Sequence, residues 1–306
     1  MKKDVDAHSR EGKLLPNGNR ARRECAPRRT LFQTIEKEQE MKKAILLISF
    51  GTTYVDAAEA SLGKIESELK EASGGIPVFP AYTSGMVIRA LAGRGIHVDT
   101  VEEAAERAKQ AGAESLYAVM THMIPGREYQ KAVEQLEKCR KEFQEIYAAS
   151  PVLGREEDCG ALIPVLREIL GLEESREYIL MGHGTDDAAN IRYVQMNEAF
   201  ENAGLPRLRI ASVESRPDLE DAMRALAQKR KRGKVLVHPF LVVAGDHARN
   251  DMAGTDDSYV TRLREAGYEV EAVVKGLGEY AQFRKIYADR LMEMLQNGSG
   301  RMEEEA

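Results

Sequence analysis

Two histidines and a glutamate stand at the ends of predicted strands in the second half of the sequence. His183 and His247 each follow an apolar run, and each lies within two residues of a glycine. Glu214 ends a third apolar run, which lies between them in the sequence. Because the carboxyl ends of parallel strands meet at one edge of a sheet, we expect the three side chains to face the same rim.

This combination of side chains predicts a metal site. Two imidazoles and a carboxylate suit a divalent first-row transition metal such as cobalt, nickel, iron or zinc. Three protein ligands leave coordination positions open, which a catalytic metal needs and a structural metal does not. A single histidine at a strand end is more often an ordinary hydrogen-bonded group, but three candidate ligands at three strand ends favour a functional site.

Other polar residues are weaker candidates for chemistry. Glu128 occupies the position in the first half that His247 holds in the second, so it is expected to face the metal site across a cleft. His122 and His238 lie inside or at the end of strands and are expected to hydrogen-bond within the core. The turn 50–53 is a candidate anion site at a helix N-terminus, but it has neither a P-loop nor a G-x-G-x-x-G pattern.

Alternating strands and helices position these residues. The pattern predicts an α/β fold of two duplicated, doubly wound domains with parallel sheets, and an active-site cleft between them. Strands are expected at 44–49, 78–82, 116–121 and weakly at 148–153, and then at 178–181, 209–213, 234–243 and 268–274. A long helix is expected from Tyr129 to Ile146. The match between Phe50-Gly51-Thr52 and His183-Gly184-Thr185, each after a strand, indicates duplication rather than a solenoid.

The chain divides into four predicted segments. Residues 1–40 hold ten Lys/Arg and seven Asp/Glu without apolar periodicity, and they are expected to be a disordered extension rather than a nucleic-acid-binding arm. Residues 41–160 are expected to form the N-terminal α/β half. Residues 161–298 form the C-terminal half with the metal ligands, and 299–306 form a polar tail.

Composition excludes several classes of protein. Of the 306 residues, 43% are hydrophobic and 31% charged, and no apolar run is long enough for a membrane span. A net charge of −6 and the absence of Trp argue against a nucleic-acid or membrane partner. Three cysteines without paired spacing exclude a disulfide scaffold and indicate a reducing environment. We therefore expect a cytoplasmic enzyme.

The chain past residue 40 resembles the sirohydrochlorin cobaltochelatases of the anaerobic pathway (CbiK type), within the class II chelatase superfamily. The matching stretches are Ile48-Ser49-Phe50-Gly51-Thr52, Tyr82-Thr83-Ser84-Gly85-Met86, Gly126-Arg127-Glu128-Tyr129, Met181-Gly182-His183-Gly184, Val213-Glu214-Ser215 and the segment 243–252 around Gly245-Asp246-His247. They follow one another in order along the chain, and the last is the most specific.

This resemblance implies insertion of Co²⁺ into sirohydrochlorin with release of two protons, an early step of anaerobic cobalamin biosynthesis. It implies that His183, Glu214 and His247 are the metal ligands, that His183 also accepts a pyrrole proton, and that Glu128 lines the cleft and assists proton transfer. Cobalt is then a substrate, and no organic cofactor is expected. Chelatases of this type commonly assemble, so a homo-oligomer is expected.

Several alternatives stay open. The metal could be Fe²⁺ or Ni²⁺, because affinity order alone does not select cobalt. Two interpretations belong to other classes of function. The protein could be a non-enzymatic carrier of a metal or tetrapyrrole, or it could bind a phosphorylated metabolite at 50–53. Basic residues are needed for the substrate carboxylates, and the candidates are Arg89, Arg94, Arg127 and Arg249. Two positions depart from the family pattern: Thr185-Asp186-Asp187 replaces further histidines, and Arg127 stands where an acidic residue is common.

Overall fold

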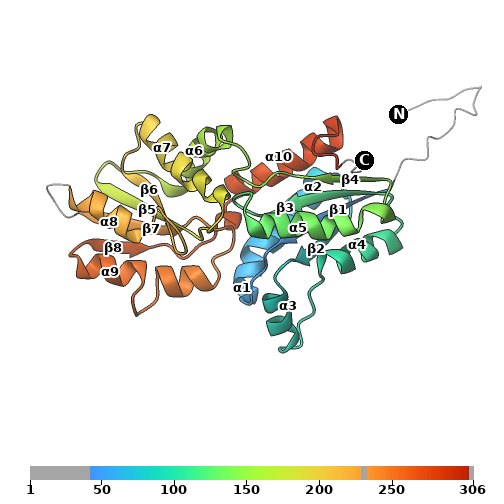
Figure 1. The fold of residues 1–306 in the computed structure, drawn as a ribbon, viewed down its shortest axis with the longest axis horizontal. Coiled ribbons are helices and arrows are strands. Elements are labelled where there is room, and N and C mark those ends of the chain that lie inside the picture. Colours follow the sequence, from blue (N-terminus) through green and yellow to red (C-terminus); the bar gives the residue numbers. More distant parts are fainter. Residues whose placement is uncertain (1–41, 229–232, 303–306) are drawn as a thin grey trace, which may run out of the picture. The chain divides into compact units, whose positions relative to one another are not determined.

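Two four-stranded parallel sheets form the framework of the protein in a computed structural model, which describes residues 42–228 and 233–302 (Figure 1). The first sheet has the strand order β2-β1-β3-β4 and the second the order β6-β5-β7-β8. Every strand pair is parallel, and the identical order in both sheets reflects the duplication. The predicted α/β fold class is therefore confirmed. The predicted extension 1–40 lies outside the described residues.

The strands agree with the apolar runs of the sequence except near their ends. Their bounds are β1 Lys43–Ser49, β2 Val78–Tyr82, β3 Ser115–Met120, β4 Glu145–Ala148, β5 Arg176–Gly182, β6 Leu208–Ser212, β7 Lys234–Pro239 and β8 Glu269–Ala272. Strand β7 is shorter than the predicted 234–243, since Pro239 has no N–H to continue a ladder. The weak strand predicted at 148–153 is wrong in position, because β4 begins at Glu145 and pairs with β3.

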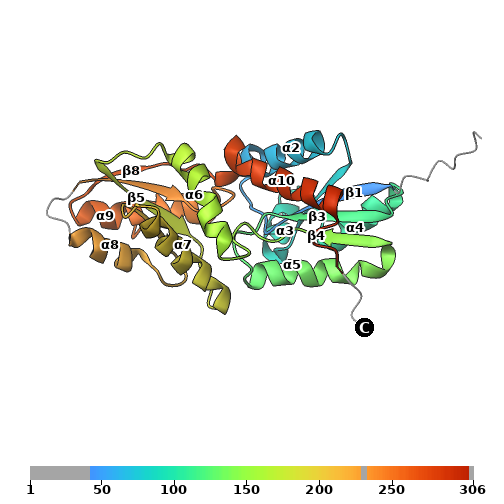
Figure 2. The same ribbon diagram turned by 90° about the horizontal axis from the view of Figure 1, so that it is seen from above.

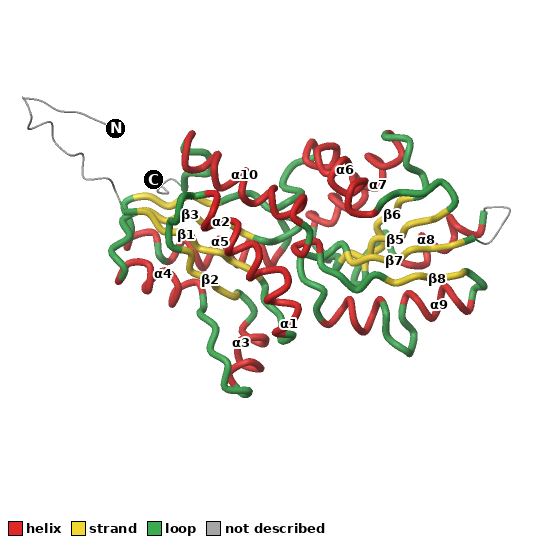
Figure 3. Tube along the Cα trace, turned by 180° about the vertical axis from the view of Figure 1, so that it is seen from behind, coloured by secondary structure: helices red, strands yellow, loops and turns green. Residues whose placement is uncertain are grey.

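Helices cover both faces of each sheet, as Figure 3 shows. Their bounds are α1 Val55–Ala58, α2 Lys64–Ala72, α3 Gly85–Ala92, α4 Val101–Gln110, α5 Arg127–Lys138, α6 Glu157–Leu170, α7 Ile191–Asn202, α8 Leu219–Ala227, α9 Tyr259–Glu265 and α10 Ala281–Asn297. The helix predicted to reach Ile146 ends instead at Lys138. Phe143 and Ile146 are still buried, but Phe143 lies in the connection to β4 and Ile146 within that strand. None of the described helices is both long and apolar enough to cross a membrane.

The C-terminal helix α10 packs mainly on the first sheet, although it follows the second sheet in the sequence. It lies beside α2 on the first sheet (Figure 2). Arg284 Nε donates to Glu68 Oε2 at 2.7 Å, and Arg290 donates to the carbonyl oxygens of Ser150 and Val152 at 2.7 and 2.9 Å. One apolar cluster extends from β1 through α10 to β5, so the two halves share part of their core. The division at residue 160 stays a prediction.

A histidine lies at each of two corresponding strands, with different surroundings: His238 is buried within β7, whereas His122 is half-buried two residues after β3. His238 Nδ1 donates to the Pro239 carbonyl at 2.8 Å, and Nε2 accepts from the Tyr280 hydroxyl at 3.0 Å. For His122 the expected core hydrogen bond is wrong. Both of its ring nitrogens are enclosed and lack a hydrogen-bond partner among the described residues, and the ring meets Tyr129 edge to face with centroids 6.0 Å apart. Burial lowers the pKa of each histidine to about 4.

Replacing Leu291 of α10 by alanine should lower the free energy of unfolding by about 2–5 kcal/mol, since a buried leucine loses its apolar contacts and leaves a cavity. Leu291 is fully buried in the shared cluster, whereas Leu295 on the same helix is only partly buried. Leu295→Ala is the matched control and should cost less. Urea denaturation followed by circular dichroism measures both, and an equal loss for the two variants would contradict the shared core.

The unfolding free energy should fall as the pH drops from 7 to 4. The unfolded chain binds protons at the ordinary histidine pKa of about 6.5, whereas folded His122 and His238 stay neutral down to about pH 4. Protonation therefore favours the unfolded state, by about 3 kcal/mol for each histidine over this range.

His122→Leu should make this pH dependence shallower without lowering stability at pH 7.5, because no hydrogen bond is lost. His238→Leu should also make it shallower but should destabilise the protein at pH 7.5, because the Tyr280 hydroxyl loses its acceptor. Denaturant titrations from pH 4 to 7.5 compare them. A His122→Leu variant with the wild-type slope would show that His122 is charged in the folded protein.

Candidate metal centre

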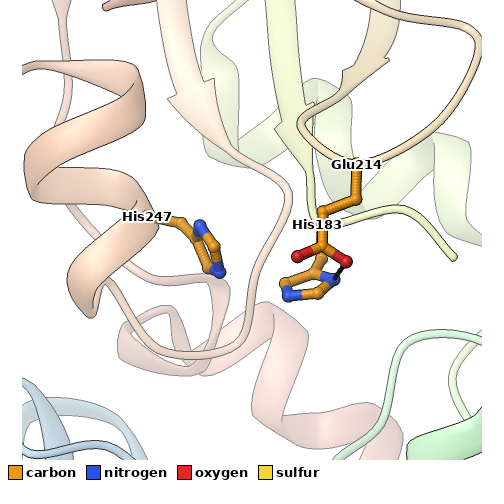
Figure 4. Close-up of side chains that lie close together, drawn as sticks. All are labelled: His183, Glu214 and His247. Atoms are coloured by element: carbon orange, nitrogen blue, oxygen red, sulfur yellow. Dashed lines mark ion pairs between the residues drawn. The ribbon is translucent and has the colours of Figure 1, made fainter.

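Three neighbouring strands of the second sheet place His183, Glu214 and His247 at one edge (Figure 4). His183 is the first residue after the central strand β5. Glu214 follows β6 by two residues on one side. His247 ends the loop after β7 on the other side, directly before a π-helical turn over Ala248–Met252. The structure thus brings together the three residues that the strand-end argument selected.

Backbone pairing beyond the strands holds Glu214 beside His183. Val213 N–H donates to the Gly182 carbonyl at 3.0 Å, and Glu214 N–H donates to the His183 carbonyl at 2.9 Å. Gly184 turns the chain away with φ of +91°, and a Cβ there would lie only 2.4 Å from Ser215 Oγ. Any larger residue at 184 would push apart the two segments that carry His183 and Glu214, so the close approach requires glycine.

The three side chains form a small, open cluster. His183 Nδ1 lies 3.5 Å from Glu214 Oε2, and the rings of His183 and His247 meet edge to face with centroids 4.6 Å apart. One ligand atom from each residue lies within 4.8 Å of the other two. A transition metal with bonds of about 2.1 Å needs ligand atoms roughly 3.4 Å apart, so small side-chain rotations suffice. The side chains are 34–54% exposed, so a substrate can reach the open coordination positions.

Asp251 orients His247, and the sequence reasoning missed it. Its Oδ2 lies 2.6 Å from His247 Nδ1, one helical turn away. A carboxylate on Nδ1 holds the proton there, turns Nε2 outward and makes it a better metal ligand. The signal in the sequence is a carboxylate four residues after a candidate histidine at the start of a helical turn.

Glu128 is not part of the three-residue cluster. It is the second residue of α5, and its side chain is 45% exposed. Its Oε2 lies 3.8 Å from Lys131 Nζ and has no hydrogen-bond partner among the described residues. The backbone just before it does approach the second half. A Cβ at Gly126 would lie 3.4 Å from Asp187 Oδ2 and 3.5 Å from Thr185 Cγ2. The expected position of Glu128 across a cleft from the metal ligands stays a prediction.

Most of the basic residues proposed for substrate carboxylates already have partners. Arg127 is paired with Asp186 at 3.0 Å. Arg249 is paired with Asp56 at 2.6 Å and stacks over the Tyr54 ring. Arg94 donates to the Thr53 carbonyl at 2.5 Å. Within residues 42–228 and 233–302, Arg89 is exposed and has no ion pair, so it is the candidate with a free guanidinium.

Two other candidate sites lie outside the three-residue cluster, and local hydrogen bonds or ion pairs already use some of their polar groups. His97, Asp99 and Glu103 also lie within metal-binding reach of one another. Glu103 accepts from the Thr100 backbone in a capping box, and Asp99 is paired with Arg107, so both carboxylates are already used. In the turn 50–53, Thr52 Oγ1 accepts from the Tyr54 N–H at 3.2 Å, so one N–H at the start of the helix is already used. An anion site at this turn stays a prediction.

Comparison with known proteins agrees with this geometry. The sequence model of the cobalt chelatase (CbiK) family matches residues 43–296. A sirohydrochlorin cobaltochelatase of Salmonella typhimurium is 33% identical over 258 residues, which cover 83% of this chain and 97% of the relative. The sirohydrochlorin cobaltochelatase CbiKC of Nitratidesulfovibrio vulgaris is 29% identical over 275 residues, covering 87% and 96%.

Two solved structures share the fold at 14% identity, each covering 86% of this chain and all of the other. They are SirB from Bacillus subtilis with Fe³⁺, with a TM-score of 0.61, and the sirohydrochlorin chelatase SirB from Bacillus subtilis subspecies spizizenii with cobalt, with a TM-score of 0.56. At this identity they speak for the fold alone. The family match spans most of the chain and includes all three clustered side chains, and on that basis the protein belongs to the cobalt chelatase (CbiK) family.

Proposed function

We propose that this protein is a sirohydrochlorin cobaltochelatase that inserts Co²⁺ into sirohydrochlorin, an early step of cobalamin biosynthesis. The observation that carries the proposal is the open cluster of His183, Glu214 and His247, in a chain that belongs to the cobalt chelatase family. Cobalt and sirohydrochlorin are both substrates in this reaction. The enzyme presents the metal to the macrocycle and removes the two N–H protons that the metal replaces.

The small number of protein ligands suits a metal that must leave. A closed cage of four ligands would retain Co²⁺, whereas two imidazoles and one carboxylate compete poorly with the four nitrogen donors of a macrocycle. Asp251 keeps Nε2 of His247 directed outward for metal binding. The exposed faces of the three side chains leave room for the substrate to approach the metal from the open side.

Metal transfer also supplies a base for the departing protons. When the metal passes to the macrocycle, the nitrogen of His183 that held it regains a free lone pair and accepts a pyrrole proton. Glu128 is proposed to take the second proton. Its support is a half-exposed carboxylate at the start of a helix whose first turn is hydrogen-bonded to the loop after His183. Both protons then pass to solvent.

Iron insertion is the second candidate function. The donor set of two imidazoles and one carboxylate accepts either metal, and solved SirB structures of the same fold contain Fe³⁺ or cobalt. Absorbance of anaerobic sirohydrochlorin with Co²⁺, Fe²⁺ or Ni²⁺, with and without catalytic amounts of protein, ranks the metals by rate. Stoichiometric binding of metal or pigment without acceleration would instead indicate a carrier.

The proposal also covers the cellular location of the enzyme, its assembly and its need for a cofactor. We propose a cytoplasmic location, which the two buried free cysteines Cys139 and Cys159 support, since both are compatible with a reducing compartment. A homo-oligomer without organic cofactor or nucleic-acid partner stays a prediction. Light scattering of the purified protein, together with its absorption spectrum as isolated, tests the assembly and the cofactor.

His247→Ala should lower the chelatase rate at least tenfold, because the metal loses one of its three ligands. The fold should survive, since His247 is partly exposed and lies after the strand rather than within it. The rate is measured by sirohydrochlorin absorbance and Co²⁺ binding by titration calorimetry. His97→Ala, which removes a histidine from the other cluster, is the matched control and should keep the wild-type rate. A His247→Ala variant with unchanged rate and Co²⁺ affinity would remove it from the ligand set.

A further inference from the structure

The first turn of α5 is bound by a side chain from the loop that follows His183. Asp187 Oδ2 accepts a hydrogen bond from the Arg127 backbone N–H at 2.9 Å. The same oxygen accepts from the Thr185 hydroxyl at 2.9 Å, and Oδ1 accepts from the Ala189 N–H at 2.7 Å. Both oxygens of the carboxylate are thus used, and one of them joins segments sixty residues apart in the sequence.

This bond supplies a cap that α5 lacks in its own sequence. The residue before the helix is Gly126, which has no side chain to accept from the free N–H groups of the first turn. The two segments lie close together here, because a Cβ added at 126 would be in van der Waals contact with Asp187 Oδ2 at 3.4 Å and with Thr185 Cγ2 at 3.5 Å. Asp187 therefore replaces the missing cap from outside the helix.

The charge state of Asp187 agrees with this role. Burial raises its pKa, but the hydrogen bonds from Ala189, Thr185 and Arg127 outweigh burial and hold the pKa below the ordinary aspartate value. An ionised carboxylate is the stronger acceptor for backbone N–H groups. The neighbouring pair between Asp186 and Arg127 is different, because both side chains are about two-thirds exposed and such surface pairs contribute little.

The location of the bond connects the two groups proposed to take protons. Asp187 lies four residues after His183, and Arg127 directly precedes Glu128. We propose that Asp187 is a positioning residue that fixes the first turn of α5, and with it Glu128, relative to the metal ligand His183. The inference rests on the proposed chelatase function. It adds that proton removal, rather than metal binding, depends on this link.

Asp187→Ala should lower kcat at least tenfold while the Kd for Co²⁺ stays within about twofold of wild type, because none of the three metal ligands is changed. Asp187→Asn should recover much of kcat, since its amide oxygen can still accept from the Arg127 N–H. Asp186→Ala is the matched control and should retain the wild-type kcat. Steady-state rates with sirohydrochlorin and Co²⁺, and titration calorimetry with Co²⁺ alone, measure these quantities.

A double-variant comparison tests whether Asp187 acts through Glu128. If it does, Glu128→Gln with Asp187→Ala should be no slower than Glu128→Gln alone, because the positioned group is already absent. Hydrogen exchange of the peptide around Arg127 should become faster in Asp187→Ala and stay unchanged in Asp186→Ala. This second readout reports on the link itself and does not depend on turnover.

The possible failures can be told apart. An inactive wild-type enzyme would overturn the proposed function and this inference with it. An active wild type with an equally active Asp187→Ala variant would overturn the inference alone. Three other results would also overturn the inference alone. They are equal losses of kcat in Asp186→Ala and Asp187→Ala, a large loss of Co²⁺ affinity in Asp187→Ala, and rate losses that multiply in the double variant.

Discussion

The parallel pairing of β6, β5 and β7 is the constraint on which the candidate metal centre depends. Pairing continues one step past the strands, where Glu214 N–H donates to the His183 carbonyl, so these two side chains must emerge next to each other. Gly184 permits the contact because a Cβ at that position would collide with Ser215. The loop after β7 then brings His247 to the same edge from the other side.

The two copies of the repeat are used for different purposes. In the second copy His238 is fully hydrogen-bonded, and the polar groups at the strand ends form the metal cluster. In the first copy both ring nitrogens of His122 are enclosed and have no hydrogen-bond partner among the described residues, whereas Glu128 is half exposed and its Oε2 lies 3.8 Å from Lys131 Nζ. Unpaired buried polar groups cost stability, and folded proteins retain them mostly where function requires them. The proposed acceptor of the second proton, Glu128, belongs to the first copy, whereas His183, the proposed acceptor of the first proton, belongs to the second.

The loops that carry the metal ligands also make the contacts between the two copies. Asp187, in the loop after His183, accepts from the Arg127 N–H at the start of α5. On the side of His247, Tyr54 donates to Asp246 and Arg249 pairs with Asp56. The closing helix α10 adds a third connection on the first sheet. Metal ligands and the proposed proton acceptor thus belong to one connected framework, as precise geometry for metal transfer requires.

Much of the fold and the candidate cluster could be predicted because their signals are local. Continuous apolar runs indicate strands buried on both faces, and the chain order of parallel strands places their ends at one edge. The positions of His183, Glu214 and His247 after such runs are enough to select them as a group. The predicted start of β4 and the predicted end of α5 were wrong. The buried apolar residues in this region fit both a helical and a strand periodicity, and pairing with β3 is what makes the segment from Glu145 a strand.

Only the tertiary structure decided which groups have partners. The sequence by itself could not show that, among the described residues, His122 has no hydrogen-bond partner while His238 has two. Nor could it show that Asp187 caps a helix sixty residues earlier. The packing of α10 on the first sheet was equally hidden, because its apolar face fits either half. Periodicity reports which side of an element is buried, whereas the identity of the covering residues depends on contacts between segments far apart in the chain.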